Sequence, residues 1–373
     1  MRSGLHDEVS HGSRVAEISV KFAFAATWLA LWLALGCSQQ HDSAASQPEP
    51  GSDTDARAVG AEPSDAPAPP GGCAGLPEAV RTRWIAFDSN RDDRSNRDIY
   101  VMRADGSERT RLTQGPGMDR EPAISPDGTR LAYVSEHDDV ALIYIYDFRS
   151  GELRQLTRWP EHTGRADWFA DSPAWFPDSK RLAFHRGRAT FVIDSDGGPE
   201  HQLAVGPDAN EDPWDGYKNP VVTPDGREVV CDIFDEIHAF DVQTGAGRLI
   251  VSSREVAAEA PSLSPDGSQL VYSTVCKESD LQLALAPTSG ERFVPCKMPL
   301  LTPPDGSRPI NAAWGPGDYI AYERDPDDGE YASSLALVRR GAAPCVFDSA
   351  GAHEANPAWA PADFALPDGF SPF

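Results

Sequence analysis

The chain has 373 residues, which is enough for one large domain or two domains of average size. Apolar residues make up 40% of it, Pro and Gly number 33 and 31, and the formal net charge is -25. This charge argues against nucleic acid as a partner, because binding phosphates requires a basic surface, and the many Pro and Gly residues favour tight turns over long helices.

The first predicted element is a signal peptide. An apolar run over residues 22–35 follows Lys21 and is long enough for a signal-peptide core but short for a bilayer span. The run ends in Ala34-Leu35-Gly36-Cys37, which resembles the bacterial lipobox. This resemblance implies that residues 1–36 are removed and that Cys37 is acylated. Because Ser follows Cys37, it also implies an outer-membrane anchor facing the periplasm; an ordinary cleaved signal is the alternative.

The next segment, residues 37–80, is predicted to be a disordered tether. It is rich in Ser, Ala, Pro, Asp, Glu and Gly, and it contains no Ile, Phe, Tyr or Trp. Such a composition cannot bury enough apolar surface to order itself. The segment would therefore separate a folded domain from the lipid anchor.

From Trp84 onward the chain repeats one unit, whose clearest mark is a turn such as Ser125-Pro126-Asp127-Gly128. In this turn Pro presets φ and Gly adopts positive φ, which is typical of a tight connection between antiparallel strands. Apolar runs of about three to five residues follow each turn, and runs this short suit strands. The turn prolines are Pro126, Pro177, Pro224, Pro265, Pro316 and Pro361. They lie about 40 to 50 residues apart, the period of four-stranded propeller blades.

The two ends of the repeat array complement each other. The N-terminal unit starts with a second strand at Trp84 and lacks a first strand. The C-terminal segment Asn356-Pro357-Ala358-Trp359 matches Ser172-Pro173-Ala174-Trp175, which begins another unit. We therefore predict an all-β, six-bladed β-propeller over residues 81–365, closed by the C-terminal strand and followed by a short tail over residues 366–373.

The repeat resembles the TolB-like, WD40-like (PD40) propeller repeat of bacterial envelope proteins. The Pro-Ala-Trp first strand, the Ser-Pro-Asp-Gly turn and the Arg-Gln-Leu-Thr fourth strand carry the resemblance, most clearly between Asp98 and Thr157. The resemblance implies a monomeric, non-enzymatic module of the cell envelope. TolB propellers bind the peptidoglycan-associated lipoprotein, so it implies an envelope protein or peptide as the partner.

Five cysteines remain once Cys37 is assigned to lipid, and an oxidising compartment allows them to pair. Cys276 and Cys296 end two parallel strands on one side of a blade, so we predict a disulfide between them. Cys73 precedes the first blade and Cys345 precedes the closing strand, so a second disulfide there is an open alternative. Cys231 lies within a strand and is predicted to be a small buried residue.

Acidic and amide residues precede most of the first strands. First strands line the channel of a propeller, so these side chains are candidates for a ring at one mouth that holds a basic peptide or a cation such as calcium. Ordinary solvated loop ends are the alternative. The candidates are Asp119, Glu121, Asp171, Asp215, Asn219, Glu259, Asn311, Glu354 and Asn356.

The sequence contains no motif of nucleophilic catalysis and no metal-ligand spacing, so we predict a binding scaffold with no catalytic residue and no required cofactor. Two alternatives remain, a propeller lyase or hydrolase and a carbohydrate or cell-wall binder at the channel mouth. Aromatic residues in the loops before first strands would favour the carbohydrate binder; they are Trp168, Phe169, Trp214 and Tyr217.

Overall fold

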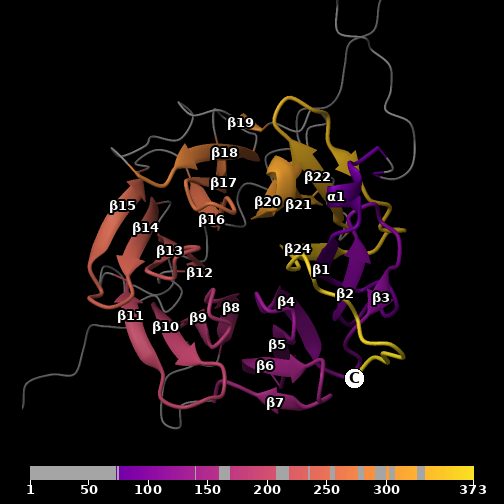
Figure 1. Cartoon of the computed structure of the whole chain (residues 1–373), viewed down its shortest axis with the longest axis horizontal. Helices are drawn as coiled ribbons and strands as arrows, with labels where there is room; N and C mark the ends of the chain where they lie inside the picture. Colours follow the sequence, from indigo (N-terminus) through magenta and orange to yellow (C-terminus); the bar gives the residue numbers. More distant parts are fainter. Residues whose placement is uncertain are drawn as a thin grey trace, which may run out of the picture. The chain divides into compact units, whose positions relative to one another are not determined.

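The computed structural model describes most of the chain beyond residue 72. The described residues are 73, 75–138, 140–158, 169–206, 218–233, 236–252, 257–275, 281–289, 300–301, 307–325 and 332–373. They form six four-stranded antiparallel sheets arranged radially around a central axis (Figure 1). The prediction of an all-β, six-bladed propeller is therefore confirmed.

Each sheet is one blade, with its first strand nearest the axis and its fourth strand outermost. Blade 1 contains β24 (Glu354–Trp359), β1 (Trp84–Ser89), β2 (Asp98–Arg103) and β3 (Thr110–Arg111), and blade 2 contains β4 (Met118–Ile124), β5 (Arg130–His137), β6 (Val140–Asp147) and β7 (Leu153–Gln155). Blade 3 contains β8 (Ala170–Trp175), β9 (Arg181–Arg186), β10 (Ala189–Asp194) and β11 (His201–Val205), and blade 4 contains β12 (Lys218–Val222), β13 (Glu228–Ile233), β14 (Glu236–Asp241) and β15 (Gly247–Val251). Blade 5 contains β16 (Ala258–Leu263), β17 (Gln269–Val275), β18 (Leu281–Pro287) and β19 (Leu300–Leu301), and blade 6 contains β20 (Arg308–Trp314), β21 (Tyr319–Asp325), β22 (Ser334–Arg339) and β23 (Cys345–Val346).

Helical structure is confined to short segments in the described part of the chain. A four-residue helix, α1 (Glu78–Arg81), precedes blade 1, and a 3₁₀ turn, η2 (Pro316–Asp318), replaces the first hairpin turn of blade 6. No helix among the described residues is long and apolar enough to cross a bilayer.

The Ser-Pro-Asp-Gly segments form the predicted hairpin turns. In blade 2 the Ser125 hydroxyl donates to Asp127 Oδ1 at 2.6 Å, and the same oxygen accepts the Thr129 backbone N–H at 3.1 Å. Gly128 has φ +69°, which costs a residue without a Cβ very little. The turn is therefore held by its own side chains, and the strands on either side enter the sheet in fixed register.

The C-terminal strand closes the ring as predicted. β24 pairs antiparallel with β1, with Ile85 opposite Trp359 and Ser89 opposite Glu354. The first strands contact one another in the order β4, β8, β12, β16, β20 and β24, and β24 returns to β4. Without β24, the channel side of β1 would be unpaired. The C-terminal strand therefore completes blade 1 and closes the ring of blades.

A disulfide and an aromatic tail hold the segments that flank this closure. Cys73 and Cys345 are joined by a disulfide with Cα atoms 5.4 Å apart, which confirms the pairing that the sequence left open. Cys231 is fully buried and free, as predicted. Residues 364–373 pack against blades 1 and 2, where Phe364 contacts the core of both.

The core lies between neighbouring blades. Second strands are almost wholly buried, since both of their faces contact an adjacent blade. Phe87, Phe184 and Tyr322 on these strands are among the largest fully buried side chains. The apolar runs after each turn thus form the layers that bind the blades to one another and fix the positions of the first strands.

Candidate functional site

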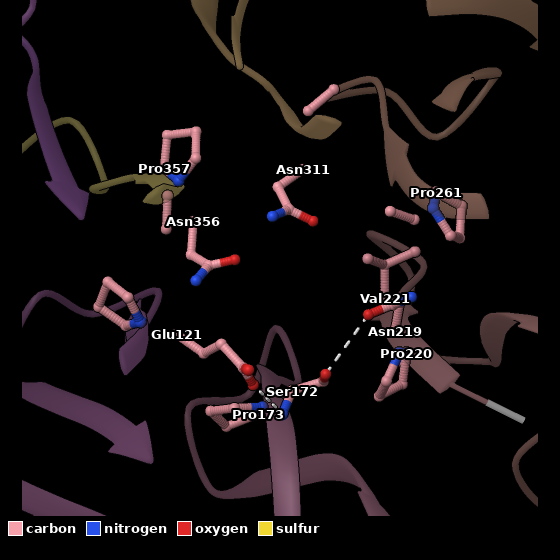
Figure 2. A pocket seen from close by; sticks show the side chains of 14 residues that line it. Glu121, Ser172, Pro173, Asn219, Pro220, Val221, Pro261, Asn311, Asn356 and Pro357 are labelled. Carbon is pink, nitrogen blue, oxygen red and sulfur yellow. Dashed lines mark hydrogen bonds between the residues drawn. The ribbon is translucent and has the colours of Figure 1, made fainter. Parts of the chain in front are cut away.

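The first strands of the six blades enclose a cavity of about 320 Å³ (Figure 2). Each blade contributes one residue at the same structural position, together with the residue that follows it. These six residues, which we call the channel ring, are Glu121, Ser172, Asn219, Ala260, Asn311 and Asn356. Figure 2 shows the side chains of Glu121, Asn311 and Asn356 directed into the cavity.

All six channel-ring residues have a left-handed backbone, with φ between 47° and 55°. Such values are uncommon for residues other than glycine, and asparagine tolerates them best, which suits the three asparagines of the ring. Five of the six precede a proline, which disfavours the right-handed helical region for the residue before it. The same uncommon backbone conformation recurs once in every blade, which indicates that this part of the channel is a regular feature of the fold.

A β-bulge in each first strand produces the ring. In blade 2 the pairing of β4 with β5 shifts between Arg120 and Ala123, and the other first strands shift at the equivalent place. The bulge breaks the alternation of side chains along the strand. Asp119 is therefore turned into the blade, where it accepts the Ser135 hydroxyl at 2.6 Å, whereas Glu121 faces the cavity.

Carboxylates behind the ring fix the orientation of its three asparagines. Asn356 Nδ2 donates to Asp88 Oδ1 at 2.8 Å, Asn219 Nδ2 donates to Asp232 Oδ1 at 2.9 Å, and Asn311 Nδ2 donates to Glu323 Oε2 at 3.0 Å. An ionised carboxylate only accepts hydrogen bonds, so the amide nitrogen must face it. The carboxamide oxygens of Asn311 and Asn356 are then left for the cavity, whereas Asn219 Oδ1 accepts the Ser172 hydroxyl at 3.5 Å (Figure 2).

The same carboxylates join one blade to the next. Asp88 Oδ1 also accepts the backbone N–H of Glu121 at 3.2 Å, and Asp232 Oδ1 accepts that of Ala260 at 3.2 Å. Glu121 Oε2 accepts the Ser172 N–H at 2.6 Å in the same manner. Bulge geometry and carboxylate placement are therefore coupled around the ring.

Burial perturbs two carboxylates that hold the ring, Asp232 and Glu323, and also Asp119 beside it. It raises the pKa of Asp232 and of Glu323 to about 7, and that of Asp119 to about 6. The cause in each case is loss of water around the charged form, which hydrogen bonds from Asn219, Asn311 and Ser135 only partly offset.

Blade 3 contributes a buried ionic pair beside the ring. His185 Nδ1 lies 2.8 Å from Asp171 Oδ1, and Nε2 lies 2.7 Å from the Gly187 carbonyl oxygen. Although burial disfavours the charged imidazole, Asp171 raises the pKa of His185, and His185 in turn holds the pKa of Asp171 below its usual range. Both ring nitrogens are engaged, so His185 has no free lone pair with which to activate a nucleophile.

The structure places the predicted channel-mouth residues in different environments. Glu121, Asn219, Asn311 and Asn356 line the cavity. The other described candidates do not: Asp119 and Asp171 are turned into the blades, and Glu259 is exposed.

Glu354 also lies away from the cavity. It is fully buried, with Arg91 Nη2 at 3.0 Å and Arg109 Nη1 at 3.4 Å from its Oε1. Although these arginines lower it, burial raises the pKa of Glu354 overall. Its environment is that of a structural ion pair in blade 1.

Several predicted residues lie outside the described part of the chain. They are Cys37, Trp168, Asp215, Trp214, Tyr217, Cys276 and Cys296. Of the predicted recognition aromatics, Phe169 is described; it is half-buried against the core between blades 2 and 3 and forms a bridge with Ala141. Acylation, the aromatic face and the Cys276–Cys296 disulfide therefore stay predictions.

Sequence reasoning missed the carboxylates behind the ring and two ring members. Ser172 and Ala260 carry no charge, but each precedes a proline at the repeat position of Glu121, and that spacing could have identified them. Asp88, Asp232 and Glu323 each follow the apolar core of a second strand. Among the described residues, no group of three or more His, Cys, Asp or Glu side chains is placed to hold a metal ion.

Comparisons with known proteins find relatives of two kinds. An uncharacterized peptidase, YuxL of Bacillus subtilis strain 168, is 27% identical over 213 residues, which are 55% of this chain and 29% of that protein. The Tol-Pal system protein TolB of Sodalis glossinidius is 31% identical over 90 residues, 24% of this chain and 21% of that protein. The chain thus matches less than a third of the length of either relative. No family model matches it.

Solved structures share the fold. The crystal structure of TolB from Acinetobacter baumannii superposes with a TM-score of 0.60 at 20% identity, covering 77% of this chain and 68% of that chain. A nidogen/laminin complex superposes with a TM-score of 0.56 at 11% identity, covering 75% of this chain and 98% of that chain. Because structures of such different proteins overlay to a similar extent, function has to be argued from the channel ring and the surface.

Proposed function

We propose that this chain, a TolB-like six-bladed β-propeller protein, is a non-enzymatic scaffold that binds a protein or peptide at the mouth of its channel. The observation that carries the proposal is the channel ring, in which carboxylates orient three asparagine amides and leave the oxygens of two of them, Asn311 and Asn356, for the cavity. Such a ring offers acceptors to a ligand that brings N–H donors.

Charge and size support a basic peptide segment as the ligand. The net charge of -25 favours encounter with a basic partner. A cavity of about 320 Å³ is at the lower end of the range for ligand pockets, so it suits an inserted side chain or chain end rather than a whole folded element. Glu121 contributes a carboxylate that pairs with Arg120 and accepts the Ser172 N–H, and Asn311 and Asn356 add neutral acceptors.

We place the scaffold in the cell envelope, as a monomer that Cys37 anchors to the outer membrane on the periplasmic side. The lipobox-like segment before Cys37 and the similarity to TolB proteins support this location. The partner would then be another envelope protein. Mass spectrometry of the mature N-terminus tests the anchor: we expect Cys37 to be the first residue and to carry acyl chains.

A propeller enzyme is the second candidate, and the similarity to a protein named as a peptidase favours it. That similarity covers 29% of the relative, so its activity does not transfer with the aligned region. The engaged state of both His185 nitrogens disfavours a nucleophile-activating role at this channel. A peptidase assay of the full chain, with hydrolysis at the channel as the positive result, distinguishes the two candidates.

The binding proposal is tested with labelled peptides and the full chain. The probe is a fluorescein-labelled decapeptide of alternating lysine and serine, and its matched comparison alternates glutamate and serine. Fluorescence anisotropy should show salt-sensitive binding of the lysine peptide, and any binding of the glutamate peptide should not respond to substitutions in the channel ring. Replacing Asn311 and Asn356 together by Ala removes two acceptors of about 1 kcal/mol each, so affinity should fall by about 30-fold.

The matched control is Gln243→Ala, which removes an exposed amide in blade 4 and should leave binding unchanged. No binding of the lysine peptide, or no effect of the Asn311 and Asn356 substitutions on its binding, contradicts the proposal. If calcium alone raises the melting temperature, and the asparagine substitutions abolish that rise without affecting peptide binding, the channel is a cation site instead.

A further inference from the structure

The groove between blades 1 and 2 holds a peptide segment of the chain itself. The ring of Phe373 stacks on Tyr146 with centroids 3.6 Å apart. The Phe373 N–H donates to the Leu112 carbonyl oxygen at 3.1 Å, and its carbonyl oxygen accepts the Gln114 N–H at 2.6 Å. The segment therefore binds here through two backbone hydrogen bonds and an aromatic contact. Figure 1 shows the C-terminal end of the chain beside blades 1 and 2.

The same groove recurs between blades 2 and 3. Leu112 N donates to the Ile99 carbonyl oxygen, and Leu156 N donates to that of Ile143 in the same way. By this equivalence Leu156 O and Arg158 N correspond to the two backbone groups that hold the tail. Neither makes a backbone hydrogen bond to another described residue.

This second groove contains a cavity of about 790 Å³. Blade 2 lines it with Arg154, Gln155, Leu156 and Arg158, and blade 3 lines it with Arg186, Asp196, Gly197, Gly198 and Glu200. Aromatic side chains face the tail in the first groove, whereas arginine side chains surround the second.

The charges of the second groove leave a positive surplus. Arg186 is buried and pairs with Glu200, while Asp196 is almost fully exposed and lies 3.8 Å from Arg154. Arg158 is exposed and has no ion-pair partner among the described residues. Three arginines and two acidic residues therefore line the groove, so its lining has a net positive charge although the net charge of the whole chain is -25.

We propose that the groove between blades 2 and 3 binds an extended, acidic peptide segment of a partner protein. The segment adds to the edge beyond β7 through Leu156 O and Arg158 N, as the tail adds beyond β3. Its carboxylates pair with Arg154 and Arg158. The site is separate from the channel ring, and it prefers the opposite charge.

The experiment uses the full chain and a fluorescein-labelled decapeptide of alternating aspartate and valine, with a lysine and valine peptide for comparison. We expect binding of the acidic peptide, weakened by salt and by the double change Arg154→Glu and Arg158→Glu by about tenfold or more. Arg227→Glu is the matched control, since Arg227 has a side chain that is 82% exposed in blade 4. Hydrogen exchange at Arg158 N should slow when the acidic peptide binds.

Three outcomes overturn the proposal. One is no binding of the acidic peptide, and another is an Arg154 and Arg158 variant that binds it as tightly as the Arg227 control does. The third is loss of acidic-peptide binding on replacing Asn311 and Asn356 by Ala, because that result would move the peptide to the channel. None of them bears on lysine-peptide binding at the channel ring, so the two proposals fail separately.

Discussion

The C-terminal segment, residues 364–373, should contribute strongly to stability through one phenylalanine, Phe364. Its side chain is 4% exposed and lies between two blades, with ring centroids 6.1 Å from Trp84 and 5.4 Å from Phe148. Phe364→Ala removes these contacts and leaves a cavity between the blades. Substitutions of this kind cost about 3–5 kcal/mol in well-packed cores, and that is the loss we expect for this residue.

Urea unfolding of the full chain, followed by circular dichroism, measures this change in the free energy of unfolding. Two variants in the same segment are the controls. Phe370 is half-buried, so Phe370→Ala should cost roughly half as much, and Asp368 is exposed, so Asp368→Ala should change stability by less than about 0.5 kcal/mol. If Phe364→Ala costs no more than Asp368→Ala, the tail does not clamp blades 1 and 2 and the reasoning is refuted.

Three further predictions concern the ring and its closure. Burial raises the pKa of Asp232 to about 7 from 3.8, so the fold binds a proton that the unfolded chain releases, and the contribution of Asp232 to stability falls as pH rises from about 4 to 7. Asp232→Asn keeps an acceptor but carries no charge. In urea titrations, the free energy of unfolding of the variant relative to the unsubstituted protein should therefore be higher at pH 8 than at pH 4; an equal difference at both pH values would contradict this. Cys345→Ser opens the disulfide to Cys73 and should cost about 2–5 kcal/mol by the same assay, whereas unchanged stability would show that the clasp is dispensable. Gly315→Ala would place a Cβ 2.2 Å from the Trp359 indole, so the melting temperature should fall by several degrees. An unaltered melting temperature would mean that the Trp359 side chain can move aside at no cost.

The repeat determined the architecture from sequence. Turn chemistry at Pro126 and its five counterparts, with short apolar runs between them, fixes four strands per unit, because each feature acts through neighbours only a few residues away. The match of Trp359 to Trp175 was enough to predict that β24 completes blade 1. These are local signals, and the structure follows them.

The channel ring was only partly visible in the sequence. Acidic and amide residues before first strands directed attention to the right level of the channel, and Asn311 and Asn356 do line the cavity. A bulge next to them changes which side chain faces the axis, so Asp119 turns inward to Ser135 while Glu121 enters the channel. Alternation along a strand cannot reveal such a change, because one extra residue reverses every side chain beyond it.

By itself, the sequence determined the number of blades, the strand order and the strand that closes the ring. Only the tertiary structure decided that Cys73 pairs with Cys345 across 272 residues, that Glu354 is buried between Arg91 and Arg109, and that Asp88 orients Asn356. The physical reason is range: turns and short strands depend on adjacent residues, whereas disulfides, buried ion pairs and oriented amides depend on which distant segments closure brings together.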